Sequence, residues 1–199
     1  MSCSALRHGV VILAAGASSR LGTSKQTLLV DGQPLIRIVT CAALATDPVM
    51  TVVVLGANAA DTFGAIADLP VHRVDCEDWA AGMGASMRAG VRPIQSACDG
   101  ILVLLCDQPA LTVYHLQRLV AAWLATPSNA IASAYARTLG APALFPRSWF
   151  ADLLQIDGDR GARDLLRGRA DGVVGIPAPE LSIDVDTPTD IRAAGLERN

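Results

Sequence analysis

A run of small residues followed by two cations is the first part of the chain with evident chemical potential. Its backbone amides could converge on phosphate oxygens, as they do in anion nests. Those amides belong to Ala15, Gly16, Ala17 and Ser18. Arg20 then adds a planar fork of donors, and Lys25 adds a compact positive charge. This spacing predicts a site for the phosphates of a nucleoside triphosphate.

Two familiar phosphate motifs do not describe this loop. A P-loop carries its lysine directly after its second glycine, whereas Thr23 and Ser24 separate Gly22 from Lys25 here. Residues 82–87 come near the dinucleotide fingerprint, but they lack its third glycine and follow no convincing strand. The remaining alternative to a phosphate site is a tight glycine turn between a strand and a helix.

Acidic residues follow two apolar runs. Asp107 ends the hydrophobic run 100–106, and an acid at the carboxyl end of a central parallel strand lies where open α/β sheets bind ligands. Asp184 and Asp186 stand two apart on a predicted strand, so both side chains project from one face and could complete a magnesium site. The alternatives are that Asp107 caps the following helix and that the later pair is a polar strand end.

Two further segments combine glycine with the start of a helix. A helix beginning near Gly84 would present its amides and the Ser86 hydroxyl to a ligand, although a plain loop and helix start explains the same letters. Residues 158–166 could likewise form a binding site. The alternative is that they form the start of a solvated helix with Asp159 as its cap. Residue chemistry alone leaves both segments open.

The elements that must position these residues alternate between strand and helix patterns. Short apolar runs predict strands at 10–13, 50–55, 71–74, 100–106, 130–135 and 143–145, the last two on either side of a break at 140–142. Periodic stretches predict helices at 34–45, 59–67, 112–125 and 150–154, with Trp123 in the core. A strand at 183–186 and a helix after Pro188 complete the pattern. This alternation predicts an α/β fold with helices on both faces of a mainly parallel sheet.

Composition limits the alternatives. With 199 residues, of which 51% are hydrophobic, the chain 1–199 fits one domain with a large core. A net charge of −3 argues against a nucleic-acid or anionic membrane surface, and no long apolar segment indicates a signal peptide or a span. The five cysteines are widely spaced and lack zinc spacing, so we expect reduced, mostly buried thiols in a cytoplasmic protein.

The loop resembles the LAAGxSxRxGxxK signature of the MobA-like nucleotidyltransferases, a family that includes molybdenum cofactor cytidylyl- and guanylyltransferases. The matching positions are Leu13, Ala14, Ala15, Gly16, Ser18, Arg20, Gly22 and Lys25. Ser24 departs from the pattern, since relatives often have proline before the lysine. The resemblance implies a three-layer α/β/α, Rossmann-like nucleotidyltransferase fold.

Later segments extend the resemblance to residue 191. The family's GMxxSxxxG segment contacts the nucleobase and ribose, and it is matched by Gly82, Met83, Ser86 and Gly90. Its LLCDQP motif binds magnesium, which implies Asp107 as a first metal ligand, and its DxDTPxD ending implies Asp186 as the second, with Asp184 in support. The GxPxxF and GDxGAR motifs imply an acceptor site. Its candidate residues are Gly140, Asp159, Gly161 and Arg163.

The resemblance implies transfer of a nucleoside monophosphate to a phosphorylated acceptor, with release of pyrophosphate. Lys25 would follow charge developing on the α-phosphate, Arg20 would hold the departing pyrophosphate, and Mg²⁺ would be the cofactor. The LAAG opening favours CTP over GTP, and the family favours molybdopterin as acceptor and a molybdoenzyme as a possible partner. The alternatives are transfer to a different phosphorylated acceptor and a non-catalytic module that escorts a molybdenum cofactor to an oxidoreductase.

Overall fold

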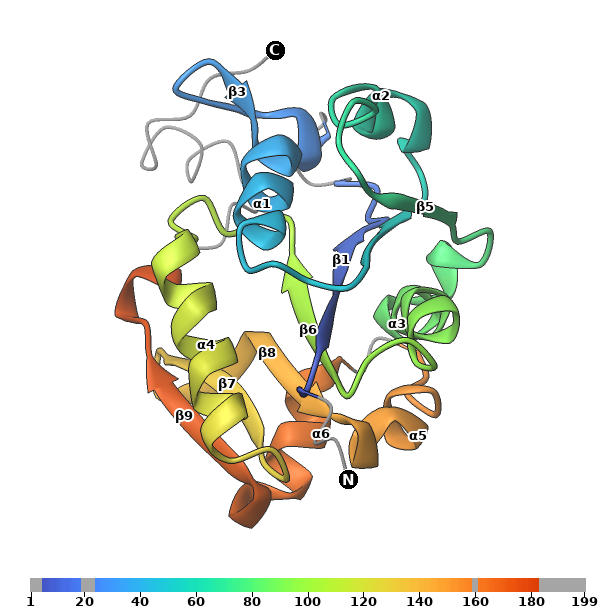
Figure 1. Cartoon of the computed structure of the whole chain (residues 1–199). Coiled ribbons are helices and arrows are strands. Elements are labelled where there is room, and N and C mark those ends of the chain that lie inside the picture. The colour runs from blue at the N-terminus through green and yellow to red at the C-terminus, as the bar shows by residue number, and fades with distance from the viewer. Residues whose placement is uncertain (1–4, 19–23, 159–160, 183–199) are drawn as a thin grey trace.

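A seven-stranded sheet forms the centre of the computed structural model, which describes residues 5–18, 24–158 and 161–182. Its strand order is β5-β4-β1-β6-β8-β7-β9 (Figure 1). The strands are β1 (His8–Ala14), β4 (Thr51–Leu55), β5 (His72–Asp75), β6 (Gly100–Leu105), β7 (Ala130–Tyr135), β8 (Thr138–Pro146) and β9 (Val173–Pro177). All pairings are parallel except those of β8 with β6 and β7, so the predicted mainly parallel sheet is confirmed.

Strand β1 lies in the interior of the sheet, where it pairs with β4 on one side and β6 on the other. All seven of its residues are buried, as expected for an apolar run covered on both faces. Val10 and Ile12 belong to one core cluster, and Val11 and Leu13 belong to the other. This alternation places a hydrophobic layer on each face of the sheet.

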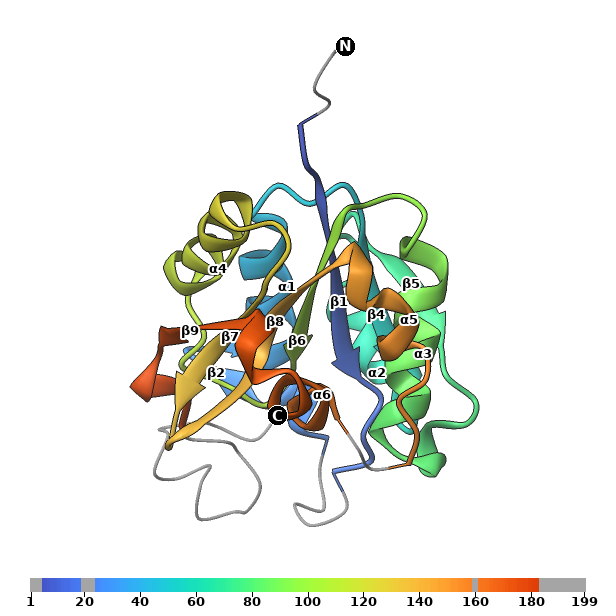
Figure 2. The same cartoon turned by 90° about the horizontal axis from the view of Figure 1, so that it is seen from below.

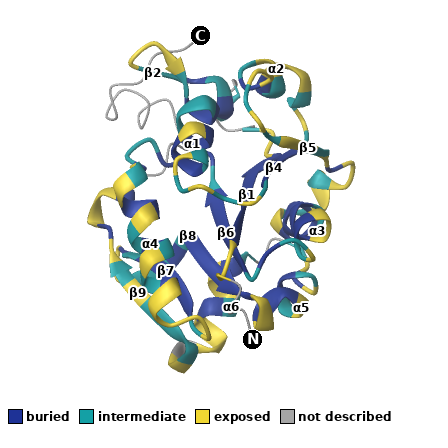
Figure 3. Ribbon diagram, viewed as in Figure 1, coloured by how far each residue is buried: buried dark blue, intermediate teal, exposed yellow. Residues whose placement is uncertain are grey.

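Helices cover both faces, which gives the expected three layers (Figure 2). Helices α1 (Leu35–Leu44), α2 (Ala59–Gly64) and α4 (Val113–Ala125) contribute to the first cluster. Helices α3 (Met83–Ile94), α5 (Phe150–Leu153) and α6 (Ala162–Gly168) contribute to the second. Figure 3 shows the buried strands between helices whose outer faces are exposed, and Trp123 on α4 is buried as predicted.

A small hairpin leads from the predicted phosphate loop into α1. It joins β2 (Leu29–Val30) and β3 (Gln33–Pro34) through Asp31 and Gly32, which have φ angles of 50° and 76°. These left-handed conformations suit the two turn residues, because aspartate tolerates them and glycine favours them. Pro34 directly precedes the first residue of α1, one position before the first helical position where proline is favoured.

The predicted break at 140–142 is wrong. β8 runs through it, and the hairpin between β7 and β8 instead turns at Ala136 and Arg137, with φ angles of 47° and 60°. The register pairs Ser133 with Gly140 but Ala132 with Ala143, so Ala141 and Pro142 form a bulge in β8. A proline without an amide hydrogen is tolerated at a bulge, where no ladder hydrogen bond is required.

Strand β9 was not predicted, although Val173 and Val174 are β-branched. It pairs in parallel with β7 at the edge of the sheet. The predicted strand at 183–186 and the helix after Pro188 lie outside the described residues. No helix in the described part of the chain is long and apolar enough to cross a membrane.

Candidate nucleotide-binding site

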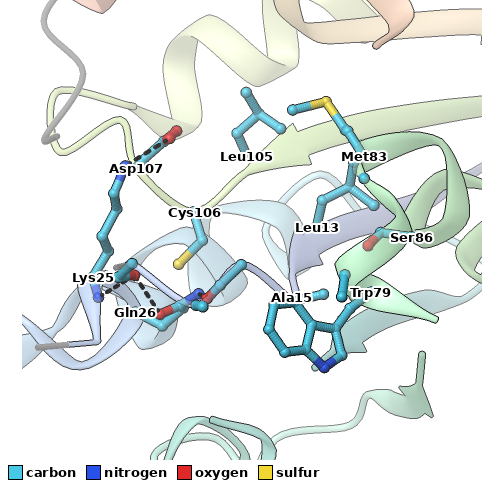
Figure 4. A pocket seen from close by; sticks show the side chains of 15 residues that line it. Leu13, Ala15, Lys25, Gln26, Trp79, Met83, Ser86, Leu105, Cys106 and Asp107 are labelled. Atoms are coloured by element: carbon cyan, nitrogen blue, oxygen red, sulfur yellow. Dashed lines mark hydrogen bonds and ion pairs between the residues drawn. The ribbon is translucent and has the colours of Figure 1, made fainter. Parts of the chain in front are cut away.

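A cavity of about 560 Å³ opens at the edge of the sheet where β1 and β6 end (Figure 4). Parallel α/β sheets bind ligands at this edge. The cavity is lined by Leu13, Ala15, Gly16, Ala17, Ser18, Lys25, Gln26, Trp79, Ala80, Gly82, Met83, Ser86, Leu105, Cys106 and Asp107. It therefore brings together the predicted loop, the predicted helix start and the predicted acid, which are far apart in the sequence. Ala14 is buried directly before the loop.

The carbonyl groups of three consecutive loop residues are all engaged inside the protein. Gln26 Nε2 donates to Ala14 O at 3.1 Å and to Gly16 O at 3.0 Å. The backbone amide of Ala57, two residues after the end of β4, donates to Ala15 O at 3.2 Å. These bonds direct carbonyl oxygens, which would repel an anion, toward donors of the protein.

Unlike the carbonyl groups, two backbone amides of the loop have no hydrogen-bond acceptor among the described residues. Among the described residues, the amides of Gly16 and Ala17 donate no hydrogen bond. Ser18 has a φ of 53°, and its Oγ accepts a hydrogen bond from the amide of Lys25 at 3.0 Å. The Ser18 side chain thus fixes the backbone from which Lys25 projects. A loop with engaged carbonyls and available amides matches the requirements of an anion site.

Lys25 lies beside Asp107, with 3.7 Å between Nζ and Oδ2. The two side chains are 16% and 29% exposed, so both are partly shielded from water. Lys25 is the only lysine in the sequence. The alternative role of Asp107 as a helix cap does not hold, because Thr112 caps α4 by accepting a hydrogen bond from the amide of His115.

The start of α3 forms the opposite wall of the cavity from Lys25 and Asp107 (Figure 4). Gly82 caps the helix with a φ of 107°, a conformation that favours glycine. Met83 and Ser86 both line the cavity, although Met83 is 41% exposed and Ser86 is buried. The segment read as a helix start therefore also contributes to the site, so the structure supports both interpretations of it.

Residues 156–158 are held against the first turns of α3. The amide of Gly84 donates to Gly158 O at 2.9 Å, and a Cβ on Gly84 would lie 2.8 Å from Ile156 O. Arg88 donates to Ile156 O and pairs with Asp157 at 3.2 Å. Glycine at position 84 is therefore required for this close approach.

Trp79 lines the cavity and was not predicted to do so. It precedes α3 and packs over Gly56, where a Cβ would lie 2.8 Å from Trp79 Cγ and 2.4 Å from Ala15 O. The lack of a side chain at Gly56 thus brings the indole ring close to the loop. A tryptophan three residues before a glycine-rich helix start was the available signal.

Gln26, Leu105 and Cys106 are the other large lining residues that sequence reasoning missed. Gln26 directly precedes the residues Thr27-Leu28-Leu29-Val30, and no motif distinguishes it in the sequence. Burial raises the pKa of the Cys106 thiol, and the neighbouring Asp107 raises it further. Cys106 therefore remains a neutral thiol at physiological pH and is poorly suited to act as a nucleophile.

Three of the predicted acceptor residues belong to the described part of the chain, Gly140, Gly161 and Arg163, and they do not line the same cavity. Gly161 caps α6 and lines a second cavity of about 590 Å³, together with Gln155, Ile156, Gly158 and neighbouring residues. A Cβ on Gly161 would lie 2.9 Å from Met83 Sδ, so Met83 stands between the two cavities. A second ligand could therefore lie beside the first.

Gly140 and Arg163 form a third location near the same edge. A Cβ on Gly140 would lie 3.7 Å from Arg163 Nε. Next to Gly140, Ala141 O accepts hydrogen bonds from Gln108 Nε2 at 3.1 Å and from Tyr135 Oη at 2.9 Å. The residue after Asp107 is thus connected to β8 beside Gly140. Neither Gly140 nor Arg163 lines the two cavities.

Four predicted site residues lie outside the described part of the chain: Arg20, Asp159, Asp184 and Asp186. Within the described residues, no group of three or more His, Cys, Asp or Glu side chains could hold a metal ion. Asp107 is the carboxylate that lines the cavity. Since Mg²⁺ is commonly held by one or two carboxylates together with substrate phosphates and water, this donor set fits magnesium.

Comparison with known proteins identifies the family of the chain. A model described as the MobA-like NTP transferase domain matches residues 10–173. The chain is 33% identical over 192 residues to the purine catabolism protein PucB of Bacillus subtilis, covering 90% of this chain and 92% of that protein. It is 34% identical to nicotine blue oxidoreductase of Paenarthrobacter nicotinovorans, covering 79% of this chain and 80% of that protein. It is 29% identical to a probable molybdenum cofactor guanylyltransferase of Nostoc, covering 91% of this chain and 87% of that protein.

A solved structure agrees with the fold across the chain. The structure of Rv0371c from Mycobacterium tuberculosis superposes with a TM-score of 0.85 at 29% identity, covering 96% of this chain and 98% of that one. The same protein has also been solved as a complex with manganese, with a TM-score of 0.79 at 26% identity and coverage of 94% and 97%. Since the names of the relatives describe different activities, membership of the family does not by itself fix the reaction.

Proposed function

Because the chain belongs to the MobA-like NTP transferase family, we propose that it is a nucleotidyltransferase that uses a magnesium-bound nucleoside triphosphate. The observation that carries the proposal is the single cavity containing the loop, Lys25 and Asp107. A loop that offers amides, a lysine and a carboxylate is what a triphosphate with its metal requires. No nucleophilic side chain of the protein is needed.

In the proposed reaction, a phosphate oxygen of the acceptor attacks the α-phosphorus of the triphosphate. A new P–O bond forms, the bond to the β-phosphate oxygen breaks, and pyrophosphate leaves with the electron pair. The acceptor phosphate is already anionic, so alignment and charge neutralisation are the main tasks of the protein. The loop amides would hold the phosphates, and Lys25 would stabilise negative charge on the α-phosphate.

Magnesium would supply neutralisation of the phosphate oxygens when bound. Asp107 would hold it, and Asp186 and Asp184 are proposed as further ligands from the sequence alone. Support for a divalent ion comes from the carboxylate at the cavity and from the related structure solved with manganese. Arg20 is proposed to hold the departing pyrophosphate on the same sequence basis.

For the substrates, we propose a cytidine nucleotide and a molybdopterin-type acceptor. The Leu13-Ala14-Ala15-Gly16 opening supports CTP, whereas the Nostoc relative is named as a guanylyltransferase and supports GTP. The acceptor phosphate would lie beside Gly161 and Met83, with Gly140, Arg163 and Asp159 as further candidates. A molybdoenzyme would then receive the product.

The test is magnesium-dependent release of pyrophosphate with each of the four triphosphates, in the presence and absence of molybdopterin. Release that requires both CTP and molybdopterin is the expected result. Release with GTP instead would change the nucleotide assignment, and release with another phosphorylated acceptor would change the acceptor. Nucleotide binding without release under any combination would favour a non-catalytic escort of the cofactor.

A further inference from the structure

Gln26 is a buried polar residue whose side chain joins both ends of the phosphate loop. Only 4% of it is exposed, yet both halves of its carboxamide are used. Nε2 donates to Ala14 O and Gly16 O before the loop's turn, while Oε1 accepts from Ser24 Oγ at 2.6 Å and from Ser18 Oγ at 3.5 Å. One side chain therefore contacts four residues of the loop.

We propose that Gln26 is the positioning residue of the phosphate site, an inference that rests on the proposed function. Its two donated bonds keep the carbonyls of Ala14 and Gly16 directed away from the ligand. Its accepted bonds hold the serine hydroxyls, one of which also receives the amide of Lys25. Gln26 thereby fixes the available amides and the Lys25 backbone in one arrangement before any ligand binds.

A neutral carboxamide is the group that this position requires. Two carbonyl oxygens need donors, and two hydroxyl groups donate to the opposite side of the same side chain. Glutamate would satisfy the hydroxyls but would place a carboxylate against both carbonyls and near the phosphates. Methionine has a similar size and can satisfy neither set.

The charge of the neighbouring residue strengthens this requirement. Lys25 directly precedes Gln26, and both residues line the cavity with Asp107 (Figure 4). A glutamate at position 26 would add a second carboxylate near the ammonium group, which would compete with the triphosphate for Lys25. The loss of phosphate affinity should therefore be larger for Gln26→Glu than for Gln26→Met.

The experiment measures binding of inorganic tripolyphosphate with magnesium by calorimetry, alongside steady-state kinetics. For Gln26→Glu we expect tripolyphosphate affinity to fall about tenfold or more, since two hydrogen bonds to the loop are lost and a negative charge is added. The KM for the nucleoside triphosphate should rise by a similar factor, while the KM for the acceptor stays near its normal value. A residue that only supported the fold would not separate the two KM values.

Two further variants keep the test decisive. Gln95→Glu is the matched control, because Gln95 also donates to a backbone carbonyl but belongs to the far end of α3 and does not line the cavity. Ser24→Ala removes only the 2.6 Å contact to Oε1, so it should fold normally and weaken tripolyphosphate binding about threefold, as expected for one hydrogen bond. It provides the answer if the Gln26 variants fail to fold.

The possible results separate this inference from the proposed function. Equal tripolyphosphate affinity in the wild type, Gln26→Glu and Ser24→Ala would overturn the positioning role even if the wild type releases pyrophosphate. Weaker binding in the variants would support the role even if no acceptor gives turnover, in which case only the proposed reaction fails. A wild type that does not bind tripolyphosphate would overturn both.

Discussion

The Nζ atom of Lys25 lies 3.7 Å from Oδ2 of Asp107, although one residue follows the phosphate loop and the other follows β6. The adjacent pairing of β1 and β6 brings these two connections to the same edge of the sheet. A cation and a carboxylate in one partly shielded cavity can serve a phosphate and its metal together.

Replacing Lys25 by alanine should lower kcat about 10²–10³-fold, the usual cost of removing one preorganised charge from a transition state. The thermal midpoint should change little because the side chain lines a cavity and belongs to neither hydrophobic core cluster. Pyrophosphate release and thermal denaturation measure the two effects. Arg92→Ala, on the last turn of α3, is the control. Near-normal turnover of Lys25→Ala would remove Lys25 from the mechanism.

Because the sequence contains no other lysine, Lys25 can be modified selectively by an amine-specific reagent. A reagent selective for amines should modify only Lys25 and the amino terminus. Bound triphosphate with magnesium should slow the modification of Lys25 and leave that of the terminus unchanged. Peptide mass spectrometry measures both rates in one sample, and equal rates with and without nucleotide would place the triphosphate elsewhere.

Asp107→Asn should raise the magnesium concentration needed for half-maximal activity and lower kcat by at least about a hundredfold. Asparagine keeps the size of the side chain but loses the charge that a hard cation prefers. Magnesium titration of pyrophosphate release provides the measurement. Asp61→Asn on the surface helix α2 serves as the matched control. An unchanged magnesium requirement would show that Asp107 is not a ligand.

Trp79→Ala should raise the KM for the nucleoside triphosphate about tenfold with a smaller change in kcat. The indole lines the end of the cavity opposite Lys25, and stacking of an aromatic ring on a base is worth about 1–3 kcal/mol. Binding of tripolyphosphate, which has no base, should be unaffected. If tripolyphosphate and nucleotide affinities fall equally, Trp79 supports the loop instead of the base.

Stability should decrease as the pH falls below about 6.5 because of two buried histidines. Burial lowers the pKa of both His8 and His115 from the ordinary value of 6.5. Each Nε2–H donates to a hydroxyl that itself donates to a carbonyl, Thr46 for His8 and Ser133 for His115. A second proton would have to bind Nδ1, and burial disfavours the charged ring that would result. The unfolded chain then binds more protons at low pH, which favours unfolding.

The check is the thermal midpoint at pH 5.5 and 7.5. His115→Asn should reduce the difference between the two values, whereas His72→Asn on the exposed edge strand β5 should not. The Arg37–Asp68 pair lies outside this window, since a side-chain hydrogen bond from Arg37 lowers the pKa of Asp68 to about 2. A pH dependence that is unchanged in His115→Asn would contradict the assignment.

Much of the fold follows from local patterns. The apolar runs that became β1, β4 and β6 are buried on both faces, and such runs are recognisable without knowledge of their neighbours. β9 escaped prediction because a short edge strand has only a weak pattern of its own. The supposed break before residue 143 failed because bulges depend on cross-strand register, which a single sequence does not contain.

Part of the candidate site was also predictable from local residue patterns. Small residues, a lysine and an acid at strand ends are visible as letters, and the structure places Gly16, Lys25 and Asp107 in one cavity. Gln26 and Trp79 were missed because their importance depends on the direction of their side chains. The assignments of Arg20, Asp159, Asp184 and Asp186 remain predictions.

The reversed direction of β8 has a consequence for how this scaffold can change its substrate. Because β8 runs opposite to its neighbours, its first residues, and not its last, reach the binding edge beside Gly140. The hairpin at Ala136 and Arg137 therefore lies at the edge that carries Gly140, whereas the described residues that line the proposed nucleotide cavity all precede β7 in the chain. A longer hairpin would therefore alter the proposed acceptor side of the site and leave the described lining of the proposed nucleotide cavity unchanged.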